Sequence, residues 1–171
     1  MKKLFLSIAF LYNVTLSAQL PMTDDSLRIL FNQIINEDDL ENLLRYQKDI
    51  HTNLSEAYFG SATVMKAQYV FSPIQKYNSF KDGTKLLETS IKTSQTVENT
   101  YLRVLVQINT PHFLGYYEDI TKDVSFIVEN IDASTLSKEW KITFLEKIVF
   151  SESDKSDFST IKIKLANYKK S

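Results

Sequence analysis

The sequence has no cysteine and only three glycines, three prolines and two histidines in 171 residues. Without cysteine there is no disulfide, no thiol nucleophile, no cysteine-ligated metal and no lipid-modified N-terminal cysteine. The glycines, at positions 60, 83 and 115, are too scattered to form a phosphate-binding loop. His51 and His112 alone do not make a multi-histidine metal centre. We therefore expect no metal and no cofactor.

The residues that are present suit one globular domain. Hydrophobic residues make up 43% of the chain, charged residues 24% and aromatic residues 12%. Disordered chains are poorer in apolar and aromatic residues. The formal net charge is −1, and the basic residues are scattered apart from Lys169-Lys170. Because nucleic-acid binding needs a concentrated basic face, we do not expect a nucleic-acid partner.

The N-terminal segment has the order of a secretory signal peptide. Basic Lys2-Lys3 is followed by the apolar stretch Leu4–Tyr12 and then by the small residues Ser17-Ala18. A membrane anchor is the alternative, but polar residues interrupt the stretch before the roughly 20 apolar residues that a span needs. We predict that residues 1–18 are a signal peptide cleaved after Ala18 and that residues 19–171 form a single helical domain. No later segment is predicted to span a membrane.

Apolar residues recur at helical spacing along the rest of the chain. The short connections predict an all-α domain of seven to eight antiparallel helices, stacked as helical hairpins or closed into a bundle. The C-terminal segment 158–168 also alternates like a strand, but a lone strand would have no partner, so we predict a helix. The expected apolar stripes are Leu27–Ile35, Leu40–Leu44, a helix opened by Asn53, Phe80–Ile91, Val97–Ile108, Ile120–Ile131, Leu136–Val149 and Phe158–Tyr168.

Several residues mark where these helices begin, end and cross. Asn53, with Glu56 three residues later, has the pattern of a capping box. Pro73 stops one helix and suits the first turn of the next. Small residues at Gly60 and Gly83 predict close helix crossings. The segment 97–108 is apolar nearly all round, which predicts a helix buried on two sides.

Two resemblances concern the fold. Ala57–Gly60 resembles the first helix of a degenerate tetratricopeptide-type hairpin, and Phe80 with Gly83 is similar to the second. A second set of residues extends over most of the chain: Ala57-Tyr58, Gly60, Ala67, Tyr69, Pro73, Phe80, Gly83, Leu102-Arg103, Gln107, Pro111, Phe113–Tyr116 and Asp123. With these residues the chain resembles a group of small secreted proteins of Bacteroidetes-type bacteria. That likeness implies an all-helical fold in the periplasm or outside a Gram-negative cell, and it carries no catalytic residue.

Arg103 and Gln107 are the first candidates for a binding site. They lie four residues apart, on one face of an otherwise apolar helix. They would receive a carboxylate or a peptide backbone if that face borders a groove. Alternatively, Arg103 pairs with an internal acid such as Asp123 or Glu88 and sets the helix register.

The other candidates are aromatic or titratable. In the linker 109–119, His112 and Tyr116 would stand at the lip of a cleft, or the linker would only break the helix at Pro111 and turn at Gly115. Tyr58 and Tyr69 belong to a tyrosine stripe that would line a ligand groove or pack in the core. The whole stripe is Tyr58, Tyr69, Tyr77 and Tyr101.

The sequence therefore favours a non-catalytic scaffold that binds a protein or peptide in the cell envelope. Stacked hairpins form concave surfaces of that kind, which is an analogy at the level of the fold. The first alternative is a carrier of a small apolar ligand, with a pocket of at least roughly 300 Å³ between helices. That pocket would lie near Tyr58, Tyr69, Tyr101 and Phe113. The second alternative is a hydrolase that uses His112, which has no nucleophile and acid beside it in the sequence.

Overall fold

The computed structural model describes residues 23–151 and 158–170, and every regular element in this part is a helix. The all-α prediction is confirmed, and the C-terminal segment forms a helix. The predicted signal peptide, residues 1–18, lies outside the described residues. The elements are α1 Asp24–Asn32, α2 Glu37–Arg45, η1 Tyr46–Lys48, α3 Asn53–Met65, η2 Lys66–Gln68, α4 Pro73–Thr93, α5 Val97–Asn109, η3 His112–Leu114, α6 Ile120–Asn130, α7 Lys138–Phe150 and α8 Ser159–Lys170.

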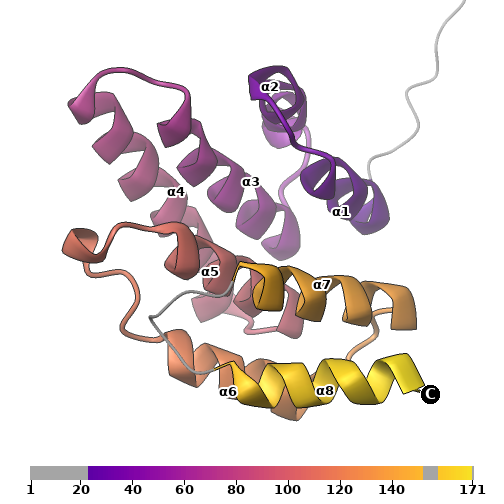
Figure 1. The fold of residues 1–171 in the computed structure, drawn as a ribbon. Coiled ribbons are helices and arrows are strands. Elements are labelled where there is room, and N and C mark those ends of the chain that lie inside the picture. Colours follow the sequence, from indigo (N-terminus) through magenta and orange to yellow (C-terminus); the bar gives the residue numbers. More distant parts are fainter. Residues whose placement is uncertain (1–22, 152–157, 171) are drawn as a thin grey trace, which may run out of the picture.

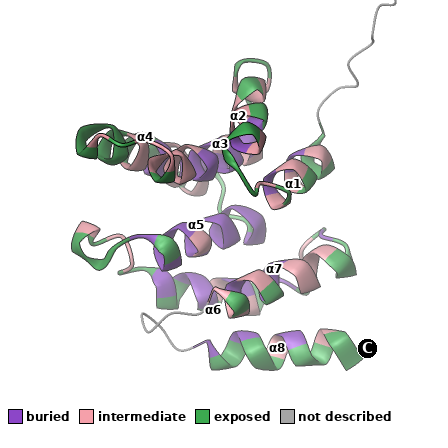
Figure 2. Ribbon diagram, turned by 45° about the horizontal axis from the view of Figure 1, so that its top comes forward, coloured by how far each residue is buried: buried purple, intermediate pink, exposed green. Residues whose placement is uncertain are grey.

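The helices form layers around α5 (Figure 1). The paired helices α3 and α4 cover one side of α5, and α6 and α7 lie on its other side, with α8 beyond them. The short helices α1 and α2 pack against α3. Colouring by burial shows that α5 is the central and most buried element (Figure 2).

The burial of α5 on two sides was predicted from its all-round apolar sequence and is confirmed. All its residues except Leu105 and Asn109 are buried. Its first turn is closed by a capping box, in which the Thr96 hydroxyl accepts from the Asn99 amide and the Asn99 side chain accepts from the Thr96 amide. Because α5 contacts both layers, polar groups on it meet partners from several helices.

Helices α3 and α4 cross at two glycines, as their sequence predicts. A Cβ atom added to Gly83 would lie 2.5 Å from the carbonyl oxygen of Gly60, and one added to Gly60 would lie 2.7 Å from that of Gly83. Only glycine permits such an approach of two backbones. This contact joins α3 and α4 into one tightly packed pair.

Helix α3 begins at Asn53, as predicted, but its capping box differs from the predicted one. The N-cap is Thr52 and its capping-box partner is Ser55, so the predicted box of Asn53 and Glu56 is wrong. The Thr52 hydroxyl accepts from the Ser55 amide at 3.0 Å, and the Ser55 hydroxyl accepts from the Thr52 amide at 2.9 Å. Ser55 is fully buried, and its hydroxyl also donates to the Thr52 carbonyl. Pro73 begins α4, as predicted.

Candidate functional site

Arg103 lies at the centre of an ion-pair cluster that joins three helices; its contact with Asp123 is buried and its contact with Glu88 is part-exposed. From α5, its Nε and Nη2 donate to both oxygens of Asp123 on α6, at 2.7 and 2.5 Å. Its Nη1 donates to Glu88 on α4 at 2.8 Å. The side chain of Arg103 is 8% exposed and that of Asp123 is 0% exposed. Arg103 therefore pairs with Asp123 and Glu88, which is the alternative given for it in the sequence analysis.

Two more of the predicted site residues join the same cluster. The Tyr116 hydroxyl donates to Glu88, and burial raises the pKa of that hydroxyl. Gln107, one turn along α5, is buried and donates to Asp123. The structure thus brings Arg103, Gln107 and Tyr116 together, and their polar groups are directed at Glu88 and Asp123. We call these residues, with Glu88 and Asp123, the Arg103 cluster.

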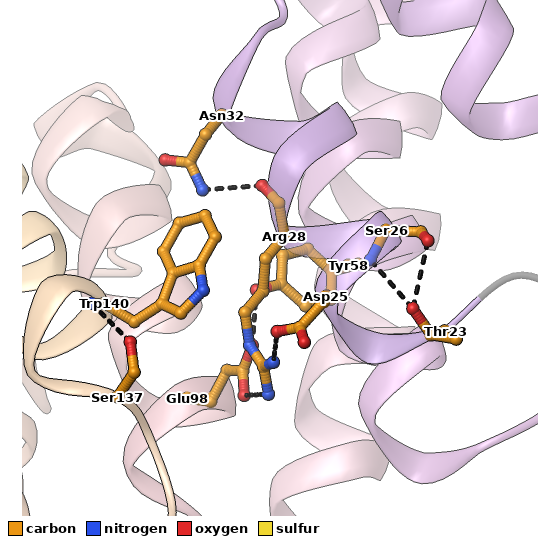
Figure 3. A network of polar contacts seen from close by, with 9 residues as sticks. All are labelled: Thr23, Asp25, Ser26, Arg28, Asn32, Tyr58, Glu98, Ser137 and Trp140. Carbon is orange, nitrogen blue, oxygen red and sulfur yellow. Dashed lines mark hydrogen bonds and ion pairs between the residues drawn. The ribbon is translucent and has the colours of Figure 1, made fainter.

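Tyr58 belongs to a second buried cluster, centred on Glu98 of α5 (Figure 3). The Glu98 carboxylate accepts from Nε and Nη2 of Arg28 at 2.6 and 2.8 Å. It also accepts from the Tyr58 hydroxyl at 2.5 Å. Burial, reinforced by the negative charge of Glu98, raises the pKa of the Tyr58 hydroxyl. We call Arg28, Tyr58 and Glu98 the Glu98 cluster; it connects α1, α3 and α5.

Sequence reasoning did not single out Arg28 or Glu98. They are 70 residues apart in the chain, so no local spacing connects them. The available signal was the position of Glu98 in the first turn of a helix predicted to be buried. A carboxylate in such a place needs a partner.

The remaining candidates lie apart from both clusters. Tyr69 follows η2, is half-buried and packs against the edge of the core. His112 is exposed on η3, with its ring 4.8 Å from that of Tyr117. Gly115 supplies the left-handed turn after η3, with φ 68°, as expected for this linker. The six predicted site residues therefore do not converge on one cleft.

The described residues do contain a large apolar groove at a different place, with a volume of about 710 Å³. It lies where the connection from α3 to α4 meets the carboxyl ends of α5 and α7 and the short helix η3. None of the six predicted site residues lines it. The residues that line it are Phe31, Ile34, Ser61, Val64, Met65, Ala67, Gln68, Pro73, Lys76, Tyr77, Phe80, Leu105, Val106, Asn109, Thr110, Pro111, Phe113, Leu114, Lys147 and Ser151.

The groove agrees only in part with the pocket expected for a carrier. Its volume exceeds the roughly 300 Å³ expected of a ligand pocket. Of the four residues expected around it, only Phe113 belongs to its lining. Tyr58 and Tyr101 are fully buried core residues instead. Of the four tyrosines in the predicted stripe, Tyr77 is the one that lines the groove.

Both charged residues in the groove lining are lysines. Lys76 lies on the first turns of α4 and is exposed, whereas Lys147 lies near the end of α7 and is half-buried. Burial lowers the pKa of Lys147. Within residues 23–151 and 158–170, no ion pair joins either lysine to an acid, unlike Lys66, Lys164 and Lys169, which each have one. The groove is therefore apolar with cationic groups in its wall.

The described part of the chain offers no group of three histidine, aspartate or glutamate side chains arranged to hold a metal ion. In this same part, no helix combines the length and the apolar character needed to cross a membrane. Comparisons with protein-family models, with curated proteins and with solved structures found no match to this chain.

Proposed function

We propose that this protein is a non-catalytic binding protein that holds a small amphiphilic molecule in the groove between the α3–α4 pair, α5 and α7. The observation that supports the proposal is the groove itself. Its volume of about 710 Å³ lies within the 300–1,000 Å³ typical of small-ligand sites. Its wall is mainly aliphatic and aromatic, and a few polar groups, such as Asn109 and Thr110, stand at one end of α5.

The proposal relies on burial of apolar surface rather than on reactive groups. Burying apolar area is worth about 25 cal/mol per Å². Tyr77 and Phe113 are 55% and 85% exposed, so their rings have surface left for a ligand to cover. Arg103 and Glu98, which form buried ion pairs, lie outside the groove lining and hold helices together.

A fluorescence titration of the purified protein with the neutral dye Nile red tests this function. We expect saturable binding, and competition by the neutral long-chain alcohol hexadecanol. Ala67→Trp places an indole at the half-buried η2 position in the groove wall and should weaken dye binding at least tenfold. Ala133→Trp, at an exposed turn away from the groove, is the matched control. Absence of dye binding, or equal binding by wild type and Ala67→Trp, would contradict the proposal.

A second candidate is the protein- or peptide-binding scaffold that the sequence favoured. Large exposed apolar side chains that are close in sequence to groove-lining residues support this candidate. Phe71, Ile74 and Phe150 are 100%, 72% and 93% exposed, and each lies within two residues of the groove lining. Exposed apolar surface of this kind is typical of interaction sites. If amphipathic peptides displace Nile red and hexadecanol does not, this candidate replaces the first.

A further inference from the structure

The charge of the groove differs in sign from that of the chain. The protein has a formal net charge of −1, with 21 acidic and 20 basic residues. The charged groups in the groove lining are nevertheless both cations, Lys76 and Lys147, and no aspartate or glutamate lies among these described residues. An apolar ligand without charge would gain nothing from them.

Lys147 is the more informative of the two. Its side chain is half-buried, so its ammonium group has lost part of its hydration, and burial lowers its pKa. The adjacent acid, Glu146, does not compensate it, because Glu146 pairs with Lys169 at 2.7 Å. A partly desolvated cation without a counter-ion in the described residues is unfavourable unless something else supplies the negative charge.

We infer that the ligand of the groove carries an anionic group at one end, received by Lys147 and Lys76, with an apolar chain lying along the groove. This inference rests on the proposed function and adds the chemical class of the ligand, an anionic amphiphile of which a long-chain carboxylate is the simplest. The positive charges of the two lysines favour a ligand with a negatively charged end over a neutral one. A lysine ammonium binds a carboxylate as a compact point charge with three donors.

The test compares two probes that differ only in the end group. Palmitate and hexadecanol are titrated separately against protein carrying Nile red, and displacement is followed by fluorescence. We expect palmitate to bind about tenfold more tightly or better, as a charge-assisted hydrogen bond allows. Lys147→Met should remove most of this difference between the two probes, while Lys147→Arg should keep it. Lys81→Met, an exposed lysine of α4 outside the groove lining, is the matched control.

The outcomes separate this inference from the proposed function. If hexadecanol and palmitate displace the dye equally, the protein still binds an apolar ligand and the anionic end group is refuted. If palmitate retains its advantage in the Lys76→Met/Lys147→Met double variant, these lysines are not the receiving groups. If neither probe binds, the proposed function fails as well. An apolar peptide with a free C-terminal carboxylate is a further probe, and displacement by it alone would replace the amphiphile with a peptide.

Discussion

Gly83→Ala tests the closest contact in the fold, the crossing of α3 and α4. In the interior of an ordinary helix, a substitution of glycine by alanine raises the free energy of unfolding by about 1 kcal/mol. Here the new Cβ would lie 2.5 Å from the Gly60 carbonyl oxygen and 2.7 Å from the backbone nitrogen of Val64. Both contacts are with backbone, so no rotamer change relieves them and the two helices must separate. We therefore expect Gly83→Ala to destabilise the protein, whereas the same change in an ordinary helix stabilises it.

The size of the effect follows from two opposed terms. Overpacking costs about 1–3 kcal/mol of stability, and occasionally more. The higher helix propensity of alanine offsets about 1 kcal/mol of this cost. The steric cost lies in the upper part of this range, about 2–3 kcal/mol, because the nearest atoms are backbone atoms of a helix that also packs against α5. We expect Gly83→Ala to lower the free energy of unfolding by about 1–2 kcal/mol.

Urea unfolding followed by the helical circular dichroism signal measures this quantity. Asn78→Ala, at an exposed site on the same helix, is the matched control and should stabilise by up to about 0.7 kcal/mol. The Gly60→Ala/Gly83→Ala double variant should lose less than the sum of the single losses, because one separation of the helices accommodates both methyl groups. If Gly83→Ala is as stable as the wild type, the crossing is looser than these distances indicate and the reasoning fails.

Three further predictions concern the polar contacts. Tyr58→Phe removes a hydrogen bond to Glu98 and should cost about 1.5–3 kcal/mol in urea unfolding; a smaller cost would mean that the bond adds little. Asp123→Asn removes the buried counter-ion of Arg103, which then retains only the part-exposed Glu88, and should cost about 3–5 kcal/mol in the same assay; an unchanged stability would contradict the ion pair's structural role. Hydrogen bonds from α8 lower the pKa of Asp132, so the stability they contribute is present above about pH 4 and is lost as the pH falls through the lowered pKa. Thermal unfolding of Asp132→Asn should be less sensitive to acid than that of the wild type, and identical acid profiles would refute this.

Much of the fold could be predicted from local sequence patterns. The apolar periodicity indicated the helices, including α8, and the all-round apolar character of α5 indicated its central position. Gly60 and Gly83 marked the crossing because only backbone contact explains small residues at such places. The pairing of Arg103 could be anticipated because an arginine in an apolar helix needs an acid. The capping box of α3 was misplaced by one residue because Thr52 and Asn53 are both good N-cap residues.

The groove could not be predicted in the same way. Its lining comes from α1, α3, α4, α5 and α7 and from two short 3₁₀ segments, so no stretch of sequence carries its pattern. The sequence around each lining residue indicates only an ordinary apolar helix face or a helix end. Its place in the fold depends on where these helices end and cross, which apolar periodicity does not encode.

The charges along and around α5 show why Lys147 is unusual. The buried ionic groups of the described residues are Arg103, Asp123 and Glu98. Arg103 donates hydrogen bonds to partners on other helices, and the two carboxylates accept them from such partners. Pairing of this kind is what burial of charge requires. Lys147 is half-buried in the groove wall without such an ion pair in the described part. A structural role would be served as well by an apolar side chain, so Lys147→Met should not lower stability while it weakens binding of an anionic ligand. A loss of stability in Lys147→Met would instead place Lys147 among the structural residues.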